Sequence, residues 1–403
     1  MYSVRKVTSD IYWIGVNDRR TDRFENIHPI PEGTSYNSYL LKDEKTVLFD
    51  AVEWGLARRF IENLEFALDG RKLDYIVVHH MEPDHGSSLA YVMEKHPEAT
   101  VVTTKRSAQM MKQFGFSKED QKIIEVGEKD TLDTGKRKIT FYMAAMVHWP
   151  EVMVSYESTE QVLFSADAFG TFGTLDGKLF SDEVGYEKNF EEYARRYYSN
   201  IVGKYGVQVQ ALLKKLSGVP LRYICSLHGP VVRTKKDITY ILDKYDKWST
   251  YTPEEKGVLI CFCSMYGGTE NAADILGEKL AERGMANFEM YDVSKTHVST
   301  LISKTFKYSH LALFGVTYNM KLFPVMRDYL DDMEALNVQN RDVVIGENGS
   351  WAPQAGNVLI AGLKRMKDMR ILNEEKMTVK SMPTLENVKE IDELAKKIID
   401  SMK

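Results

Sequence analysis

The sequence predicts an α/β protein in two parts, a mixed sheet layer with helices outside it followed by a doubly wound parallel sheet. Strand and helix signals alternate irregularly over residues 1 to about 250 and regularly beyond Gly257. The run Trp248–Gly257 between these regions is polar and rich in turn-forming residues. A chain of 403 residues is also too long for one ordinary core, since a domain averages about 150 residues. We therefore predict two domains, over residues 1–250 and 256–403.

In the N-terminal part, short runs of apolar and β-branched residues predict strands, and longer runs with helical periodicity predict helices. The helices are expected over Trp54–Leu68, Phe190–Ile201 and Val207–Leu216. The strands are expected over Ile11–Val16, Tyr36–Leu41, Thr46–Asp50, Leu73–His80, Thr100–Thr104, Lys138–Ala145, Val152–Glu157, Val162–Asp167 and Tyr223–His228. This irregular mixture fits a sheet layer with helices outside it.

The C-terminal part alternates strands and helices in strict order. The strands are expected over Val258–Cys263, Phe288–Val293, His310–Val316, Arg341–Gly346 and Met377–Met382. The helices are expected over Thr269–Arg283, near Val298, near Met326, near Leu363 and over Asn387–Met402. Five strands that alternate with five helices indicate a doubly wound parallel sheet.

Composition and charge narrow the class of partner. A formal net charge of -5 and a pI near 6.1 leave no basic excess for nucleic acid or an anionic membrane surface. The N-terminus Met1–Arg5 lacks a secretory apolar core, and no apolar run reaches the roughly 18 residues of a membrane helix. We therefore predict a cytoplasmic protein with small-molecule or protein partners, and with no nucleic acid or membrane partner.

Cysteine usage excludes two kinds of site. The chain has three cysteines, Cys225, Cys261 and Cys263, and no Cys-x-x-Cys pair. Neither a disulfide framework nor a thiolate iron site of the rubredoxin type is therefore encoded. Any electron carrier of that type must be a separate molecule.

The run His80–His85 reads His-Met-Glu-Pro-Asp-His and follows the apolar stretch Tyr75–Val78 after one residue, His79. Two imidazoles and two carboxylates at a strand end are seldom buried unless they are paired or bind a metal. A His-x-His-x-Asp-His run would indicate a zinc hydrolase, whereas Glu82 here occupies the middle position, which favours iron or manganese. Strand alternation directs His79 away from His80, so we expect His79 to pack or to orient a ligand.

Three further polar residues each end an apolar strand candidate. His148 follows Ala144–Val147, Asp167 follows a run that ends at Ala166, and His228 follows a run that ends at Leu227. A single polar residue at a strand end is most often a cap or a turn residue. Several together at the strand ends of one sheet layer can point at one place, and we expect them to join the metal site.

A second cluster of polar and glycine residues lies between the predicted strand Val258–Cys263 and the helix after it. The loop Ser264–Glu270 offers hydroxyls, glycines and free backbone amides at a helix N-terminus, which form a phosphate cradle without a lysine. The missing lysine argues against a nucleotide triphosphatase. Two more loops, Gly315–Asn319 and Gly346–Trp351, follow the third and fourth strands and should lie beside the phosphate site.

The metal run, the three strand-end residues and the phosphate loop together resemble the flavodiiron proteins over essentially the whole chain. The resemblance implies a metallo-β-lactamase-like αββα sandwich with two non-haem irons over residues 1–250. It also implies a flavodoxin-like five-stranded parallel sheet that binds FMN over residues 256–403.

The resemblance assigns roles to individual residues. Asp167 would bridge the two irons, and Tyr197 matches a tyrosine near the diiron pocket, although packing on an amphipathic helix explains it equally well. His85 corresponds to a residue that some members do not use as a direct ligand. The remaining ligands would be His80, Glu82 and His148 for one iron and Asp84, His85 and His228 for the other. The residues expected around FMN are Ser264, Met265, Tyr266, Gly267, Gly268, Thr269, Thr317, Tyr318, Asn319, Gly349, Ser350 and Trp351.

The activity implied is that of an oxidoreductase that reduces dioxygen to water, nitric oxide to nitrous oxide, or both, and so scavenges these gases in an anaerobe or microaerophile. Two ferrous ions and one reduced FMN hold the four electrons that dioxygen requires. The electron donor implied is rubredoxin, with a reduced deazaflavin or a flavin reductase as alternatives. The family forms head-to-tail homodimers, so we expect a homodimer or a homotetramer of two such dimers.

Two other functions fit parts of the pattern. A metal-dependent hydrolase of the metallo-β-lactamase superfamily with an attached flavodoxin domain would share the fold, since fold alone does not determine function. Glu82 and the phosphate loop count against it. An electron carrier or redox sensor would need no intact metal site, whereas all seven ligand residues are present.

Overall fold

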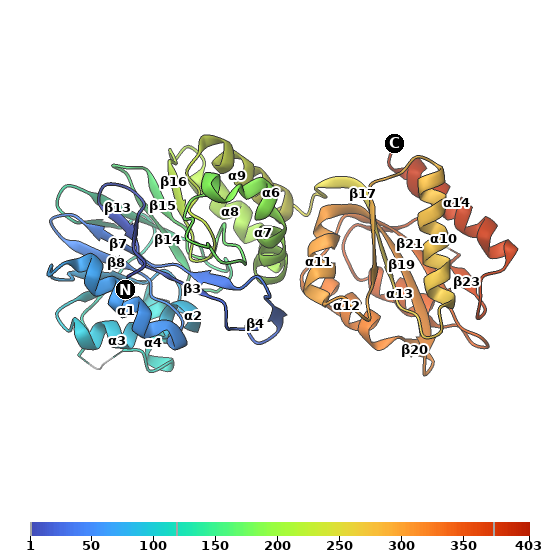
Figure 1. Ribbon diagram of the computed structural model, residues 1–403, viewed down its shortest axis with the longest axis horizontal. Coiled ribbons are helices and arrows are strands. Elements are labelled where there is room, and N and C mark those ends of the chain that lie inside the picture. The colour runs from blue at the N-terminus through green and yellow to red at the C-terminus, as the bar shows by residue number, and fades with distance from the viewer. Residues whose placement is uncertain (1, 118–119, 374) are drawn as a thin grey trace. The chain divides into compact units, whose positions relative to one another are not determined.

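The computed structural model describes residues 2–117, 120–373 and 375–403 and separates the chain into two compact units (Figure 1). The first unit runs to Tyr198 and includes Val207–Asp246, and the second comprises Ser199–Gly206 and Lys247–Lys403. The first is a sandwich of the metallo-β-lactamase type and the second is flavodoxin-like, so the predicted fold class is confirmed.

Two sheets form the centre of the first unit. The larger sheet contains, in spatial order, β1 (Arg5–Lys6), β2 (Ile11–Trp13), β7 (Tyr39–Lys42), β8 (Thr46–Phe49), β9 (Tyr75–Val77), β10 (Thr100–Thr103) and β11 (Ile123–Glu125). The smaller sheet contains β12 (Thr131–Asp133), β13 (Lys138–Met143), β14 (Met153–Glu157), β15 (Val162–Phe164) and β16 (Tyr223–Cys225). Two short hairpins pair β3 (Val16–Asp18) with β6 (Thr34–Tyr36) and β4 (Arg23–Phe24) with β5 (His28–Pro29).

The core of this unit lies between the two sheets. Phe49 of β8 stacks on Phe164 of β15 with ring centroids 3.9 Å apart, and Tyr39 of β7 meets the same ring edge-on at 5.6 Å. Alternate residues of each strand thus face the opposite sheet and are buried. This packing fixes the ends of β9, β15 and β16 relative to one another, and six of the seven candidate metal residues follow these three strands, while His148 lies between β13 and β14.

Helices cover the outer faces of this sandwich (Figure 1). They are α1 (Ala57–Leu68), α2 (Pro83–Gly86), α3 (Leu89–Lys95), α4 (Lys105–Gln113), α5 (Ser181–Val184), α6 (Tyr186–Asn189), α7 (Glu191–Tyr197), α8 (Gly206–Leu216) and α9 (Lys235–Ser249). A π-helical turn, Tyr198–Val202, follows α7 directly. Among the described residues, no helix combines the length and the apolar character needed to cross a membrane.

The second unit is a parallel sheet with helices on both faces. Its core order is β18 (Phe288–Asp292), β17 (Glu255–Phe262), β19 (Tyr308–Tyr318) and β21 (Arg341–Asn348). The fifth position is shared by β22 (Met369–Ile371), which pairs with the start of β21, and β23 (Met377–Val379), which pairs with its end. The spatial order 2-1-3-4-5 is that of flavodoxin-like sheets. A short β20 (Lys321–Leu322) pairs antiparallel with the end of β19.

Five helices complete this unit. They are α10 (Gly268–Glu282), α11 (Val298–Lys307), α12 (Pro324–Ala335), α13 (Ala355–Leu363) and α14 (Leu385–Ser401). Helices α10 and α14 contact each other, while α12 contacts both α11 and α13. Buried residues of α10 and α14 pack with β17, β19 and β21 in one apolar core.

Two predicted strands differ from the structure for a local physical reason. The strand predicted over Leu73–His80 ends at Val77, because the His79 amide donates to the Asp50 carboxylate at 2.7 Å instead of joining the ladder. The strand predicted over Tyr36–Leu41 is divided between β6 and β7. Asn37 lies at this division and donates to the carbonyl oxygens of Ser226 and Gly229.

The second unit should lose stability in acid through Glu289 of β18. Burial raises the pKa of this carboxyl, but hydrogen bonds from Tyr291 and Tyr308 and the Lys304 ammonium outweigh it and lower the pKa to about 2. Because the pKa of Glu289 is lower in the folded chain than in the unfolded chain, its ionised form stabilises the fold. This stabilisation is complete at pH values above the unfolded pKa of about 4.3 and is lost as the pH falls through about 2.

Because Glu289 is partly exposed, we expect Glu289→Gln to lower the free energy of unfolding by only about 1 kcal/mol at pH 7. We expect no difference from the wild type near pH 2, as measured by urea unfolding at each pH. Glu393→Gln, a change of an exposed carboxylate, is the control. A Glu289→Gln deficit that persists at pH 2 would contradict this assignment.

Candidate metal centre and flavin pocket

The seven predicted metal residues occupy the loops that follow the sandwich strands. His80 lies three residues beyond β9, Glu82 caps the short helix α2, and Asp84 and His85 lie within that helix. The other three lie in the β13–β14 loop (His148) and in the loops after β15 (Asp167) and β16 (His228). The structure brings these seven side chains into two adjacent groups.

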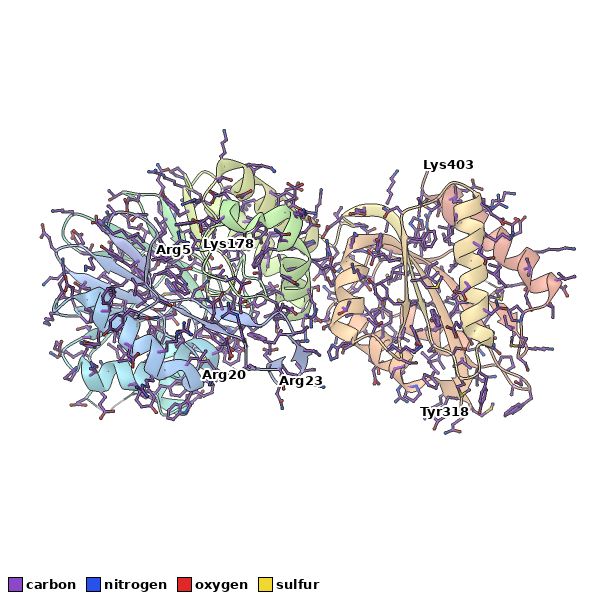
Figure 2. All side chains as sticks on the ribbon, viewed as in Figure 1. Arg5, Arg20, Arg23, Lys178, Tyr318 and Lys403 are labelled. Atoms are coloured by element: carbon purple, nitrogen blue, oxygen red, sulfur yellow. The ribbon has the colours of Figure 1, made fainter. Side chains whose placement is uncertain are left out.

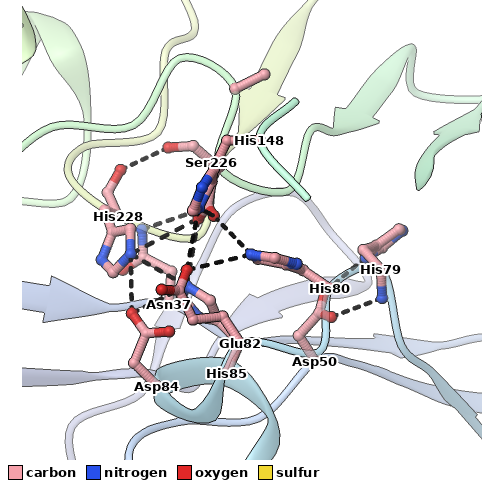
Figure 3. Close-up of polar contacts among 12 residues, drawn as sticks. Asn37, Asp50, His79, His80, Glu82, Asp84, His85, His148, Ser226 and His228 are labelled. Carbon is pink, nitrogen blue, oxygen red and sulfur yellow. Dashed lines mark hydrogen bonds and ion pairs between the residues drawn. The ribbon is translucent and has the colours of Figure 1, made fainter. Parts of the chain in front are cut away.

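In the first group, Glu82 Oε2 lies 3.2 Å from His80 Nε2 and 3.0 Å from His148 Nε2. In the second group, Asp84 Oδ2 lies 3.3 Å from both His85 Nε2 and His228 Nε2. Figure 3 shows these side chains converging from separate segments of the chain. Each group therefore offers two imidazole nitrogens and one carboxylate to a single point.

Asp167 lies between the two groups. Its Oδ2 is 3.2 Å from His80 Nε2 and 3.3 Å from His148 Nε2. Its Oδ1 is 3.2 Å from His85 Nε2 and 3.6 Å from His228 Nε2. One carboxylate thus directs one oxygen to each group, which is the geometry that a bridging ligand requires.

The centre attracts positive charge. Burial by itself would lower the pKa of the His148 imidazole, but hydrogen bonds to Asp167 and Glu82 raise it to about 9. Burial would raise the pKa of the Asp167 carboxyl, yet the charges of His80 and His85 hold it well below its ordinary value. Carboxylates that remain ionised while completely buried favour cation binding at this point.

The donor set fits a pair of metal ions. Both carboxylate oxygens of Asp84 and of Asp167 are buried and accept no hydrogen bond among the described residues. Buried polar atoms normally have hydrogen-bond partners, so these unpartnered carboxylate oxygens are suited to bind metal ions. Imidazole with carboxylate is a ligand set of non-haem iron.

Other buried groups hold the ligand segments in place. His79 bonds Asp50 Oδ2 at 2.5 Å and Ser155 Oγ at 2.7 Å, so it supports the loop and does not face the metal groups. Sequence reasoning did not single out Glu151, whose Oε1 lies 2.8 Å from His80 Nδ1. In the sequence, Glu151 is distinguished only as an acidic residue three positions after the predicted ligand His148, in a loop rich in bulky residues.

Tyr197, the predicted catalytic residue, lies at the end of α7 beside the second metal group. It is completely buried, and its ring centroid lies 5.3 Å from that of His228. Its hydroxyl has no hydrogen-bond partner among the described residues. Burial and the nearby Asp167 carboxylate raise the pKa of this phenol well above 10, so the hydroxyl keeps its proton and can donate it in a hydrogen bond.

The second unit carries a hollow of about 600 Å³ at the carboxyl ends of its parallel strands. Its walls include eleven of the twelve predicted flavin residues: Ser264, Met265, Tyr266, Gly268, Thr269, Thr317, Tyr318, Asn319, Gly349, Ser350 and Trp351. Gly267 does not line it, but its φ of +87° closes the turn before α10, a conformation that favours glycine. Ligands of open α/β sheets bind at this edge.

Four residues of this hollow lie outside the loops that the sequence predicted: Met320, Ala352, Ser381 and Met382. Val316 and Asn348 also line it and lie within the predicted loops, but they were not among the residues expected around FMN. Ser381 and Met382 follow β23, and Asn348 Nδ2 donates to the Ser381 carbonyl at 3.0 Å. The fifth predicted strand ran through Met382, so the loop at the end of this strand was not expected at the pocket. Its place at the carboxyl edge is the signal that could have found it.

The hollow fits a flavin mononucleotide. Helix α10 opens with free amides and the Thr269 hydroxyl at one end, which suits a phosphate. Two exposed aromatic rings, Tyr266 at 94% and Trp351 at 89%, stand at the mouth, which suits a planar ring system. Tyr318 projects at the same edge (Figure 2). The Thr317 hydroxyl instead accepts from the Gln354 and Ala355 amides and caps α13.

A methyl group at Gly268 should weaken flavin binding. A Cβ there would lie 1.9 Å from the Ser381 carbonyl oxygen and 2.9 Å from Asn348 Nδ2, so Gly268→Ala must push two pocket loops apart. Overpacking costs about 1–3 kcal/mol, and about 1.4 kcal/mol is tenfold in affinity. We expect the Kd for FMN, measured by fluorescence quenching, to rise about tenfold or more. Gly127→Ala, where the nearest atom is 3.6 Å away, should leave it unchanged, and equal affinities would contradict the expectation.

Known proteins that are similar to this chain support both the metal centre and the flavin pocket. The family model described as "ODP family beta lactamase" matches residues 34–229, the span that carries all seven metal residues. The rubredoxin-oxygen oxidoreductase of Megalodesulfovibrio gigas is 30% identical over 404 residues, which cover 99% of this chain and 98% of that protein.

A second relative and a crystal structure are similar to this chain over most of its length. The anaerobic nitric oxide reductase flavorubredoxin of Vibrio vulnificus is 29% identical over 86% of this chain and 70% of its own length. The crystal structure of the flavodiiron protein from Giardia intestinalis superposes with a TM-score of 0.93 at 25% identity, over 99% of this chain and 97% of that one. The chain therefore belongs to the flavodiiron protein family, whose members carry a diiron centre and FMN.

Proposed function

We propose that this protein reduces dioxygen to water, nitric oxide to nitrous oxide, or both, at a diiron centre that FMN supplies with electrons. The observation that carries the proposal is the pair of ligand groups joined by Asp167, with one carboxylate oxygen directed to each group. A binuclear site of this kind places two metals at one substrate pocket. The named reductases among its relatives act on oxygen or on nitric oxide.

The side chains of the centre have two roles: some would bind the irons, and others exclude water from the pocket. His80, Glu82 and His148 would hold one iron, Asp84, His85 and His228 the other, and Asp167 would hold both. When bound, two irons and the flavin together supply the electrons that the reduction consumes. Tyr197 packs beside His228 with ring centroids 5.3 Å apart and keeps a protonated, unpartnered hydroxyl, while Phe24 lies edge-on against His228 with centroids also 5.3 Å apart. These rings keep water from one side of the pocket.

We also propose residues 1–250 as the diiron domain and residues 256–403 as the FMN domain, the latter holding FMN through the pocket residues named above. The electron donor proposed is rubredoxin, as the name of the Megalodesulfovibrio relative suggests. Since the sequence has no Cys-x-x-Cys pair, the donor would be a separate protein. Reduced deazaflavin and a flavin reductase are the other donors to assay beside it.

The exposed surface around the flavin pocket supports a head-to-tail homodimer. Six apolar side chains that line the pocket are exposed, namely Met265, Tyr266, Tyr318, Met320, Trp351 and Met382, and the exposed Leu385 follows three residues after Met382. We name this set the apolar collar. A patch of this kind is typical of a surface that another protein covers. We propose that a second copy covers the apolar collar, so that the FMN of one chain serves the irons of its partner.

Dilution tests the dimer. We expect the iron- and FMN-loaded chain, of 46.2 kDa, to sediment at twice that mass. We expect Leu385→Lys, a change of an exposed collar residue that does not line the flavin pocket, to shift it toward the monomer and to slow turnover while FMN stays bound. A loaded monomer at high dilution that keeps full reductase turnover would refute the head-to-tail arrangement.

Anaerobic stopped-flow measurements test the activity. The purified chain should contain two irons and one FMN, and the reduced form should be reoxidised by dioxygen, by nitric oxide, or by both when each gas is mixed in turn. The ratio of the two rates gives the physiological preference. Zinc in place of iron, together with hydrolytic activity, would favour a metallo-β-lactamase-type hydrolase instead.

A further inference from the structure

The two metal positions have matching direct ligands, so any difference between them must come from the groups behind the ligands. Each position has two imidazoles and one carboxylate of its own and shares Asp167. The hydrogen bonds made by the far nitrogens of the imidazoles are different at the two positions.

At the first position, His80 Nδ1 meets a carboxylate. Glu151 Oε1 lies 2.8 Å from His80 Nδ1 and 3.0 Å from the Met81 amide, and both the Glu151 and His80 side chains are fully buried. This contact fixes His80 with Nε2 directed at the metal position. Glu151 lies in the same loop as His148, so one loop supplies a ligand and also orients its neighbour.

At the second position, no described carboxylate bonds the far nitrogen of either imidazole. His228 Nδ1 donates to the backbone carbonyl of Ser35 at 2.8 Å, which is a neutral acceptor. His85 Nδ1 is buried and has no hydrogen-bond partner among the described residues. Among the described contacts, Glu151 is the only carboxylate outside the ligand set that bonds a ligand imidazole.

A carboxylate that accepts a hydrogen bond from a ligand histidine makes its metal-binding nitrogen more basic and holds the ring in one tautomer. Removing such a partner typically costs about 10- to 100-fold in metal affinity. Because Glu151 is fully buried, its charge is poorly screened by solvent. The added charge acts on the first position and much less on the second.

We infer that Glu151 is a positioning residue that makes the two metal positions unequal, so that the position formed by His80, Glu82 and His148 loads first and binds its ion more tightly. This inference rests on the proposed diiron function. It adds an order of assembly, in which the second ion enters a centre whose bridging carboxylate is already engaged.

Anaerobic titration of the metal-free chain with cobalt(II), followed by absorption and chelator competition, tests the inference without reference to turnover. The wild type should load in two steps, the first about 10- to 100-fold tighter than the second. His148→Ala should remove the tighter step and His228→Ala the weaker one. Two equal steps, or the reverse assignment, would overturn the inference.

Glu151→Gln keeps the shape and an acceptor oxygen but removes the charge. It should weaken only the tighter step, by about 10- to 100-fold, so that the two steps merge, and Glu151→Asp should restore part of the difference. Glu157→Gln removes another fully buried carboxylate of the same unit, one that pairs with Arg137, and should leave both steps unchanged.

A Glu151→Gln effect spread equally over both steps, or absent, would overturn the inference. If a Glu151 variant does not fold, the wild-type titration and the two histidine variants still decide the loading order. A wild-type chain that binds fewer than two ions would refute the proposed diiron function, which is a different outcome from two ions bound equally.

Discussion

Asp167→Ala is expected to abolish reductase activity toward both gases while leaving FMN bound. Asp167 is fully buried, and its two oxygens each face a different pair of imidazoles at 3.2 to 3.6 Å. Its removal takes away the one anion shared by both metal positions. Metal ions contribute several kcal/mol of charge stabilisation, so we expect turnover to fall roughly 10³-fold or more.

Iron and flavin analyses on the same sample separate the two sites. The Asp167→Ala chain should retain one FMN but hold much less than two irons, because the flavin pocket belongs to the other unit. Asp176→Ala, an exposed aspartate that pairs with Arg19, should retain both irons and full activity. Retention of two irons and of rapid reoxidation in Asp167→Ala would remove the basis of the proposed mechanism.

Arg341→Leu is expected to destabilise the flavodoxin-like unit more than any surface substitution. The guanidinium is fully buried at the start of β21 and donates to five backbone carbonyls: those of Tyr251, Thr305, Phe306, Gln339 and Asn340. Burial lowers its pKa to about 9, so it is still charged at pH 7. Without it, five acceptors lose their donor.

Loss of a buried charged donor typically costs about 3–5 kcal/mol, which for a unit of this size is a shift of roughly 6–20 °C in Tm. Release of FMN fluorescence on heating reports this unit alone. Arg341→Lys should recover part of the loss. Arg370→Leu removes an exposed arginine that pairs with Asp342 and should shift Tm by only about 1–2 °C. Equal shifts for Leu at both positions would show that the carbonyl cluster is unimportant.

The metal ligands were predictable because they lie in the loops and the short helix that follow buried strands. His80, His148, Asp167 and His228 follow apolar runs, and parallel or neighbouring strands end at one edge of the sandwich. The phosphate loop was predictable for the same reason, since it joins β17 to α10. A polar residue or a glycine-rich loop after an apolar run can be recognised in a single sequence.

Glu151 and Arg341 could not be predicted in the same way. Glu151 contacts His80, a residue 71 positions earlier, only because the β13–β14 loop reaches the His80–Met81 segment that follows β9. The Arg341 contacts depend on chain turns far from it in sequence. Long-range contacts of this kind leave no local pattern.

Some elements were missed although the sequence carries a signal for them. Ile238, Ile241, Tyr245 and Trp248 are buried at helical spacing along α9, which was not among the predicted helices. Helix α4 differs, because most of its residues are polar and only Ser107, Ala108 and Met111 are buried. Its helical pattern is therefore weak.

The loops that form each site have a consequence for synthesis of the chain. The metal centre needs both His80 and His228, so it cannot close until the ribosome has passed the β16 loop. The flavin pocket starts at Ser264 and needs Met382. Domains generally fold as they emerge, N-terminal first. The nascent chain can thus complete its metal centre before the flavin pocket, which needs Met382, can form, and metal and flavin can be acquired in that order.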